Sequence, residues 1–391
     1  MKKCLKFLAV AGVMSMIMAG CGDKSNTSAS VSVDTSTSTE VSTSVSTSTV
    51  VSDSTSVSGE PTDEPEVIPE NAVRSEITNE WIDESIKNQR PLAIMVDNEK
   101  TALDHYGLNK YADVVYELMN STENGRVTRL MCIVKDWKNI EQFGSIRSTR
   151  PTNVMVAAEW NAVLIHDGGP FYINDYLDKG YTPHLSGGFA RFSNGKNWEF
   201  TEYLTGTTYH NADRGEDYQG ITDRLAGAGI SENYTEYYEG AHFEFNDKDV
   251  SFAGRPDAIK VSRIELPYPH NESTLVYNEK TKLYEYSEYG KEHVDPLDDN
   301  KVLAFKNLIV YSVDYFVYDE NGYMIYNCVG SGDQGWYVTD GYAIPIHWAK
   351  PDESLQTDYF DLSKGGKIKL NTGKTYITMV PSDVWSDVVI K

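Results

Sequence analysis

The feature that most limits how this chain can fold is the segment from Ser25 to Glu60. Serine and threonine make up 22 of its 36 residues, and it has no aromatic residue, lysine or arginine. Such a segment has too little apolar surface to offset the entropy that ordering the chain costs. Proline and acidic residues follow in the run EPTDEPEVIPE, residues 60–70, and extend the chain further. We therefore predict a disordered stalk over residues 21–85, so that the folded part lies beyond it.

The residues before the stalk, 1–20, have the pattern of a secretion signal. Three early lysines precede an apolar stretch over residues 7–19, which is too short for a typical membrane-spanning helix. The stretch ends in Met18-Ala19-Gly20-Cys21, which is similar to a bacterial lipobox, where small residues precede a cysteine that receives acyl chains such as palmitate. An ordinary cleavable signal with a chance cysteine is the alternative, and the stalk argues against it. We predict a lipoprotein on the outer face of the cell membrane, anchored through Cys21.

Charge and motif content limit the partners and the chemistry. The chain has 58 acidic and 35 basic residues, a formal charge of −23, and no local basic patch, so we expect no nucleic-acid partner. The HExxH, CxxC, P-loop and GxSxG motifs are all absent, and the Gly168-Gly169 pair lacks the GxGxxG spacing of a dinucleotide site. The expected partners are the membrane, through the lipid anchor, and a cell-wall glycan or an envelope protein. The sequence leaves open whether the protein is an enzyme, and it establishes no cofactor.

Residues 86–240 have the pattern of an α/β domain, a layered sheet with helices. The run LAIMVDN, residues 92–98, predicts a buried strand, and the apolar runs 112–119 and 126–134 flank the turn-rich NSTENG and predict a hairpin. Pro151 suits the first position of a helix through Trp160, with Ser148 or Thr149 as its cap. A strand over residues 162–169 and a further helix complete the alternation of strands and helices.

Residues 255–391 predict a mostly β domain. Short aromatic and β-branched runs are separated by hairpin signals, as in YNEKTKLYEY, VYDENGYMIY, YVTDGYAI and KLNTGKTYI. Cys132 and Cys328 lie in apolar runs of different regions, which favours buried free thiols over a bridge.

Polar residues gather at the expected strand ends of the first domain, where open α/β sheets usually bind ligands. They form a candidate anion or ligand site of Asp97, Asn98, Asp113, Arg147, Arg150, His166 and Asp167. Arg147 and Arg150 flank a predicted helix start, whose free N–H groups favour an anion. The alternative is that both arginines pair with surface carboxylates. His166 suits a general base or a metal ligand, or a simple hydrogen-bonded residue at a strand end.

Several runs in the same order resemble the YerB-like lipoprotein family of Gram-positive bacteria. RPLAIMVDN, ADVVYEL, TRLMCIV, GSIRSTRP and HDGG are similar to its N-terminal domain, and KNLIVYSVDY, VGSGDQGWYVTDG, IHWAK and LNTGKTYITMVP to its C-terminal domain. This chain departs from the family at Pro170, where a polar residue is usual. The family's Pro-His-Asn segment is Tyr209-His210-Asn211 here, which adds His210 to the candidate site. The resemblance implies paired domains of unknown function, so we expect a cell-envelope binding or accessory module.

A second resemblance, to the LytR-CpsA-Psr glycopolymer transferases, implies the alternative function. The order of Asp113, a following strand, Ser145-Ile146-Arg147 and a later Gly-Gly pair is similar to theirs. By this resemblance the protein would be a phosphate-directed transferase acting on lipid-linked glycan, with Arg147 and Arg150 on phosphate and Asp113 on Mg²⁺. Those enzymes have Asp directly after the first arginine, where this chain has Ser148.

Overall fold

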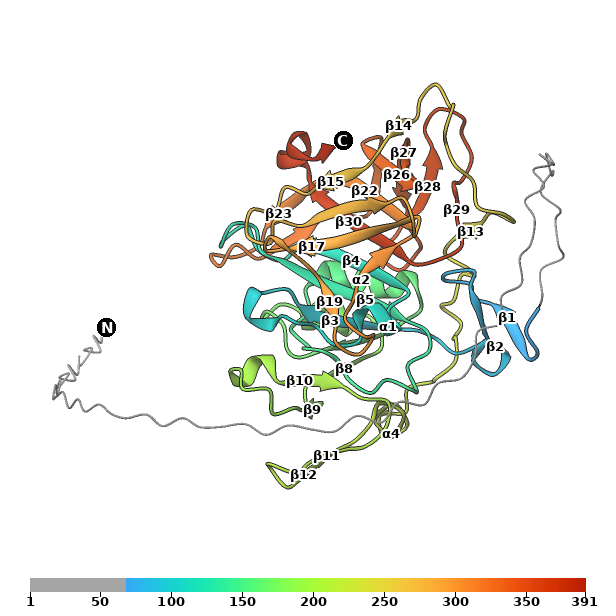
Figure 1. Ribbon diagram of the computed structural model, residues 1–391. Helices are drawn as coiled ribbons and strands as arrows, with labels where there is room; N and C mark the ends of the chain where they lie inside the picture. The colour runs from blue at the N-terminus through green and yellow to red at the C-terminus, as the bar shows by residue number, and fades with distance from the viewer. Residues whose placement is uncertain (1–67) are drawn as a thin grey trace, which may run out of the picture. The chain divides into compact units, whose positions relative to one another are not determined.

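The computed structural model describes residues 68–391 (Figure 1). The predicted signal, Cys21 and most of the predicted stalk lie outside these residues. The end of the predicted stalk is folded, however, because β1 (Ala72–Arg74) and β2 (Trp81–Asp83) pair as a hairpin before the 3₁₀ turn η1 (Glu84–Ile86). The folded part therefore begins earlier than the predicted residue 86. No helix within residues 68–391 has the length and apolar character needed to span a membrane.

A twelve-stranded mixed sheet forms the centre of the fold. Its main path runs, in spatial order, through β14 (Ile259–Lys260), β27 (Tyr342–Lys350), β26 (Gly335–Thr339), β22 (Asn307–Val313), β30 (Thr375–Pro381), β4 (Val114–Met119), β5 (Thr128–Val134), β3 (Leu92–Asp97), β7 (Val163–His166) and β8 (His184–Ser186). Two short strands, β25 (Gly330–Gly332) and β28 (Asp358–Asp361), pair with β27. Every residue of β3, β4, β5, β22 and β30 is buried, which explains their nearly continuous apolar runs.

The two halves of the chain meet in this sheet. Strand β30, near the C-terminus, pairs in parallel with β4 from Thr375 opposite Val114 to Met379 opposite Leu118. In Figure 1 the C-terminal strands, in orange and red, accordingly adjoin the N-terminal strands in teal. The residues that we assigned to two domains, 86–240 and 255–391, thus share a sheet and one apolar core.

A six-stranded sheet belongs to the C-terminal half. It runs through β18 (Lys291–Glu292), β17 (Leu283–Glu288), β16 (Thr274–Asn278), β15 (Arg263–Glu265) and β31 (Val389–Ile390), with β21 (Ala304–Phe305) on β17. Buried and partly exposed residues alternate along β17, as expected of a strand that packs on the core through one face.

Smaller sheets complete the strands. These are β6 (Phe143–Gly144) with β10 (Glu202–Leu204) and β9 (Ala190–Arg191), β11 (Tyr209–Asn211) with β12 (Glu216–Tyr218), β13 (Glu244–Phe245) with β29 (Lys369–Leu370), β19 (Val294–Asp295) with β20 (Lys301–Val302), and β23 (Tyr315–Val317) with β24 (Met324–Tyr326).

Helices are few in the described residues. They are α1 (Leu108–Tyr111), α2 (Pro151–Glu159), α3 (Asn174–Leu177) and α4 (Ile221–Ala228), with short 3₁₀ turns η2 (Lys100–Ala102), η3 (Trp198–Phe200) and η4 (Ser382–Asp387). The structure is therefore mostly β. Its C-terminal half is β, as predicted, whereas the expected helical layer of the N-terminal half is reduced to α2 and short pieces.

The predicted strand 92–98, the hairpin and the helix beginning at Pro151 are confirmed as β3, β4–β5 and α2. The cap of α2 is Arg150, whose backbone N–H donates to Asn153 Oδ1 at 3.1 Å, and not Ser148 or Thr149. Cys132 and Cys328 are both buried and free, as predicted.

Candidate functional site

The buried Asp97 and the partly exposed Arg147 form an ion pair at the end of β3. Arg147 Nε lies 2.5 Å from Asp97 Oδ2, and a second nitrogen lies 3.1 Å from Glu199. The chain after β6 runs beside β3 and positions the pair, because Asp97 N–H donates to the Ser145 carbonyl and Arg147 N–H to that of Met95. The positive charge of Arg147 is thus balanced by carboxylates, in agreement with the alternative interpretation of this arginine.

Arg150 is placed differently, beside a second arginine. Arg129, in β5, donates to the carbonyl and hydroxyl oxygens of Ser148 at 2.8 and 3.2 Å, and Arg150 donates to the Thr149 carbonyl at 2.8 Å. The Arg150 guanidinium also lies 4.0 Å from the centre of the Tyr323 ring. Neither arginine lies within ion-pair distance of a carboxylate of the described residues, although the charge of Asp97, which is opposite Arg129 in the β3–β5 pair, acts on Arg129 and that of Asp319 on Arg150.

Burial makes this arrangement unusual. Arg129 and Arg150 are 9% and 6% exposed, and the Nε atom of each is buried without a hydrogen-bond partner. Burial, reinforced by the neighbouring charge of Arg129, lowers the pKa of Arg150 to about 9. Burial likewise lowers the pKa of Arg129. Two like charges removed from water are costly unless an opposite charge joins them.

A small pocket adjoins both arginines at the start of α2. Its lining comes from both halves of the chain and consists of Leu118, Met119, Asn120, Arg129, Arg150, Thr152, Asn153, Met324 and Tyr326. The space left for a guest is about 10 Å³, roughly the room that one water molecule or one oxygen of an oxyanion needs. The start of a helix also contributes a partial positive charge. This pocket is the part of the candidate site suited to an anion.

The backbone at the end of β7, which carries His166 and Asp167, lies beside the backbone of Arg147. The side chains of His166 and Asp167 have other partners. Asp167 N–H donates to the Arg147 carbonyl, whereas its carboxylate lies 3.8 Å from Arg191. His166 contacts the Gly168 carbonyl through Nδ1 at 2.8 Å and His184 through Nε2 at 3.1 Å. Burial lowers the pKa of His166 to about 4, which favours a neutral, hydrogen-bonded imidazole at this strand end.

The remaining predicted residues do not join the arginines. Asp113 precedes β4 at the opposite end of that strand, where its carboxylate accepts from Lys135 N–H at 2.7 Å and burial raises its pKa to about 7. His210 lies on the exposed β11–β12 hairpin and pairs with Asp217 at 2.7 Å. Asn98 donates to the Thr128 hydroxyl at 2.8 Å. The structure therefore leaves Asp113 and His210 elsewhere and brings the other predicted residues to one end of the sheet, namely Asp97, Asn98, Arg147, Arg150, His166 and Asp167.

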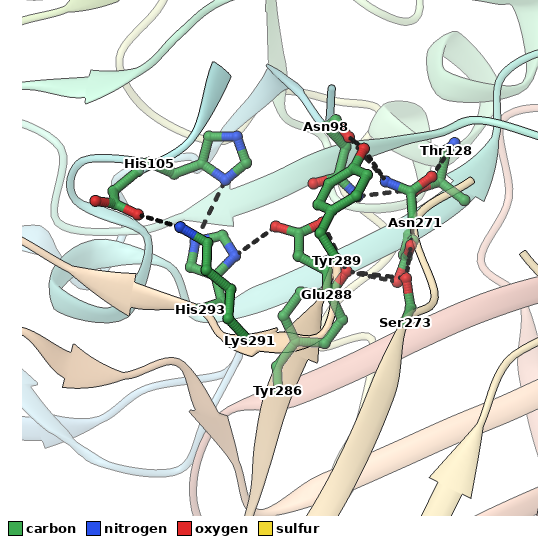
Figure 2. Close-up of polar contacts among 12 residues, drawn as sticks. Asn98, His105, Thr128, Asn271, Ser273, Tyr286, Glu288, Tyr289, Lys291 and His293 are labelled. Atoms are coloured by element: carbon green, nitrogen blue, oxygen red, sulfur yellow. Dashed lines mark hydrogen bonds and ion pairs between the residues drawn. The ribbon is translucent and has the colours of Figure 1, made fainter. Parts of the chain in front are cut away.

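A buried polar network that the sequence did not indicate joins the two halves (Figure 2). The carbonyl oxygen of Asn98 accepts from Asn271 at 2.7 Å and from the Tyr289 hydroxyl at 2.5 Å. The Glu117 carboxylate accepts from four hydroxyls, those of Thr128, Ser273, Tyr286 and Tyr376, at 2.5 to 3.0 Å. Burial raises the pKa of Glu117 in spite of these donors.

The same network contains a cluster suited to a metal ion. His105 lies between β3 and α1, Glu288 ends β17, and His293 follows β18. All three are buried, and one donor atom of each lies within 4.8 Å of the others. His105 is 188 residues from His293, so no local motif contains all three residues, although Glu288 and His293 are only five residues apart. Arg129 was missed as well, although an arginine within the apolar run TRLMCIV was a usable signal.

These features define a class of protein: a mostly β fold in which an N-terminal and a C-terminal half share a sheet and enclose polar groups between them. Residues 77–219 match the N-terminal domain, and residues 264–377 the C-terminal domain, of the protein family of unknown function DUF3048. The chain belongs to the YerB-like family, as its sequence predicted.

Two comparisons support this assignment. The lipoprotein YerB of Bacillus subtilis (strain 168) is 22% identical over 324 residues, which cover 81% of this chain and 89% of that protein. The crystal structure of YerB protein from Bacillus subtilis superposes with a TM-score of 0.64 at 19% identity, over 82% of this chain and 99% of that chain. This structural likeness establishes the shared fold.

Proposed function

We propose that this protein is a lipoprotein, tethered to the outer face of the cell membrane through Cys21, whose folded part binds an anionic group of a cell-envelope partner. The observation that carries the binding proposal is the pair Arg129 and Arg150, buried beside the start of α2, each with an Nε atom that has no hydrogen-bond partner and with no carboxylate in ion-pair contact. The phosphate of a cell-wall glycan has the chemistry that this pair would recognise.

The charge of the chain supports this proposal. The chain has 58 acidic and 35 basic side chains. An arginine with a purely structural role would therefore be expected to pair with a carboxylate. Arg147 and Arg191 both have one, with Asp97 at 2.5 Å and Glu202 at 2.7 Å. A guest oxygen between Arg129 and Arg150 would accept charge-assisted hydrogen bonds and offset their burial.

Binding is tested with inorganic phosphate and pyrophosphate as probes, by thermal unfolding of the purified protein. A ligand at 100 times its dissociation constant stabilises the folded state by about 2.7 kcal/mol, so phosphate should raise the Tm of the wild type. We expect Arg150→Gln and Arg129→Gln to weaken that effect at least about tenfold in phosphate concentration.

The matched control for this experiment is Arg214→Gln. Arg214 is exposed and paired with Glu216 at 2.8 Å, so its removal should leave the phosphate effect unchanged. Equal stabilisation of the wild type and both buried-arginine variants would refute an anion site at α2.

The tether is supported by the lipobox-like end of the signal and by the lipoprotein name of the Bacillus subtilis relative. We expect Cys21→Ala to move the protein from the detergent-rich to the aqueous phase in Triton X-114 partitioning of cell fractions. The change removes the thiol that carries the acyl chains and leaves residues 1–20 intact. A Cys21→Ala protein that stays in the detergent phase would show that another feature holds it there.

The transferase alternative receives no such support. It requires Asp113 beside the arginines as the ligand of Mg²⁺, and Asp113 precedes β4 whereas Arg129 and Arg150 lie near the other end of that strand. We therefore propose a binding module without a metal-assisted transfer step.

A further inference from the structure

We propose that His105 and His293, together with Glu288, bind a divalent transition-metal ion such as Zn²⁺ between the two halves of the fold. The proposal rests on the geometry of two imidazole nitrogens, on the proton positions that their partners allow, and on the charge of the surrounding groups. It is independent of the anion site at α2, which uses different residues.

The positions of the nitrogens fit a shared ion. His293 Nδ1 lies 2.9 Å from Glu288 Oε1, and His293 Nε2 lies 3.3 Å from His105 Nδ1 (Figure 2). A carboxylate beside one ring nitrogen holds the proton there and orients the other nitrogen for a metal. Two nitrogens bound at about 2.05 Å to a tetrahedral Zn²⁺ are about 3.3 Å apart, which matches the observed separation.

Hydrogen bonding alone does not satisfy the pair. With its Nδ1 proton shared with Glu288, His293 presents a lone pair at Nε2. If His105 donates from Nδ1, its own Nε2 is a buried lone pair without a donor, since that atom has no hydrogen-bond partner. If the proton is on His105 Nε2 instead, two lone pairs face each other at 3.3 Å. A cation between the nitrogens resolves the second arrangement.

The nearby carboxylates favour a cation, whereas Lys196 and Lys291 oppose positive charge at His105. The Tyr286 hydroxyl connects Glu117 and Glu288, at 3.0 and 3.5 Å. Neither carboxylate forms an ion pair with a lysine or arginine of the described residues, and Glu288 pairs only with His293. The nearby Lys291 is paired with Asp104 at 3.3 Å.

The ligand set indicates which ion fits. Imidazole suits Zn²⁺ and related transition metals, whereas Mg²⁺ prefers oxygen ligands. Glu288 stays on His293 Nδ1 as the carboxylate that orients the ring. The remaining positions on the ion would be open to water or to a ligand.

The experiment uses the purified full chain after treatment with a chelator. Zn²⁺ affinity is measured by competition with a chromophoric chelator, and Co²⁺ serves as a spectroscopic probe. We expect one equivalent to bind and Co²⁺ to give the visible absorption of a tetrahedral site. His105→Gln and His293→Gln should each weaken Zn²⁺ binding by more than about 100-fold, and Glu288→Gln by about 10- to 100-fold.

His242→Gln is the matched control, because His242 is also a buried histidine paired with a glutamate, Glu159, at 3.0 Å. It has no second imidazole in hydrogen-bond contact, so this variant should bind Zn²⁺ like the wild type. Wild-type protein that binds no Zn²⁺, or Zn²⁺ binding that survives in His293→Gln, would overturn the proposal. Should a variant fail to fold, the wild type still decides: a Tm that does not rise with Zn²⁺ also overturns it.

Discussion

At the scale of single residues, burial disfavours the ionised form of several carboxyl groups. Asp113 is the clearest case, since burial raises its pKa from 3.8 to about 7 and its hydrogen bond from Lys135 N–H only partly opposes this. A raised pKa means that the folded state binds the proton more tightly than the unfolded state does. The folding free energy therefore becomes less favourable as the pH rises from about 4 to 7.

We predict that Asp113→Asn flattens this part of the pH profile. The amide keeps an oxygen that accepts from Lys135 N–H and carries no charge at any pH. The variant should be more stable than the wild type at pH 8, by about 2–4 kcal/mol, and should lose that advantage near pH 4. Urea unfolding at both pH values measures it, and a constant difference at the two would contradict the assigned pKa.

The positions of Asp97 and Arg147 at the end of β3 could be predicted from the strand and helix signals beside them. The role of Arg147 could not, because its guanidinium pairs with Asp97 and Glu199. Sequence reasoning failed where partners are distant: His105 and His293 are separated by 188 residues, and nothing local to either histidine indicates the other. The pairing depends on the tertiary fold.

At the scale of elements, helix α2 is held by a buried charge at its last residue. Glu159 pairs with Lys350 of β27 at 2.9 Å, and it also accepts from Thr357 and pairs with His242 at 3.0 Å. Burial alone would raise the pKa of Glu159, but these partners, led by Lys350, lower it to about 2. The stabilisation is therefore present above pH 4.5 and is lost as the pH falls toward 2.

We predict that Glu159→Gln destabilises the protein by about 3–5 kcal/mol at pH 7, because it leaves Lys350 buried without its counter-charge. Guanidinium unfolding measures the change. Glu353→Gln is a suitable control, since Glu353 pairs with Lys179 near the surface and such pairs contribute about 0–1 kcal/mol. Similar losses in the two variants would argue against a special role for the buried pair.

Helices and strands could be predicted where the residues that indicate them are close together in the sequence. The turn-rich NSTENG and its apolar flanks led to the β4–β5 hairpin, and Pro151 led to the first residue of α2. The parallel pairing of β4 with β30 could not be predicted in this way, since parallel strands are joined by long connections that leave no mark on either strand. The further helix expected after residues 162–169 is the short α3, Asn174–Leu177.

At the scale of the whole molecule, the two family domains are joined by more than the chain between them. They share the central sheet, the apolar core, the Glu117 network and the His105 cluster. The pocket beside Arg129 and Arg150 is also built from both halves, through Asn120 and Thr152 on one side and Met324 and Tyr326 on the other. Ligand binding in this pocket would depend on how the two halves pack against each other. An assignment of the two halves to separate domains does not reveal this dependence.

The central claim is that Arg129 and Arg150 hold an anion at the start of α2, and anomalous scattering from crystals soaked in bromide tests it most directly. Bromide is a single atom, somewhat larger than the one water molecule for which the pocket has room. The account predicts an anomalous difference peak between the two guanidinium groups, and its loss in crystals of Arg150→Gln. Bromide peaks found elsewhere on the wild-type protein, with none in this pocket, would contradict the claim.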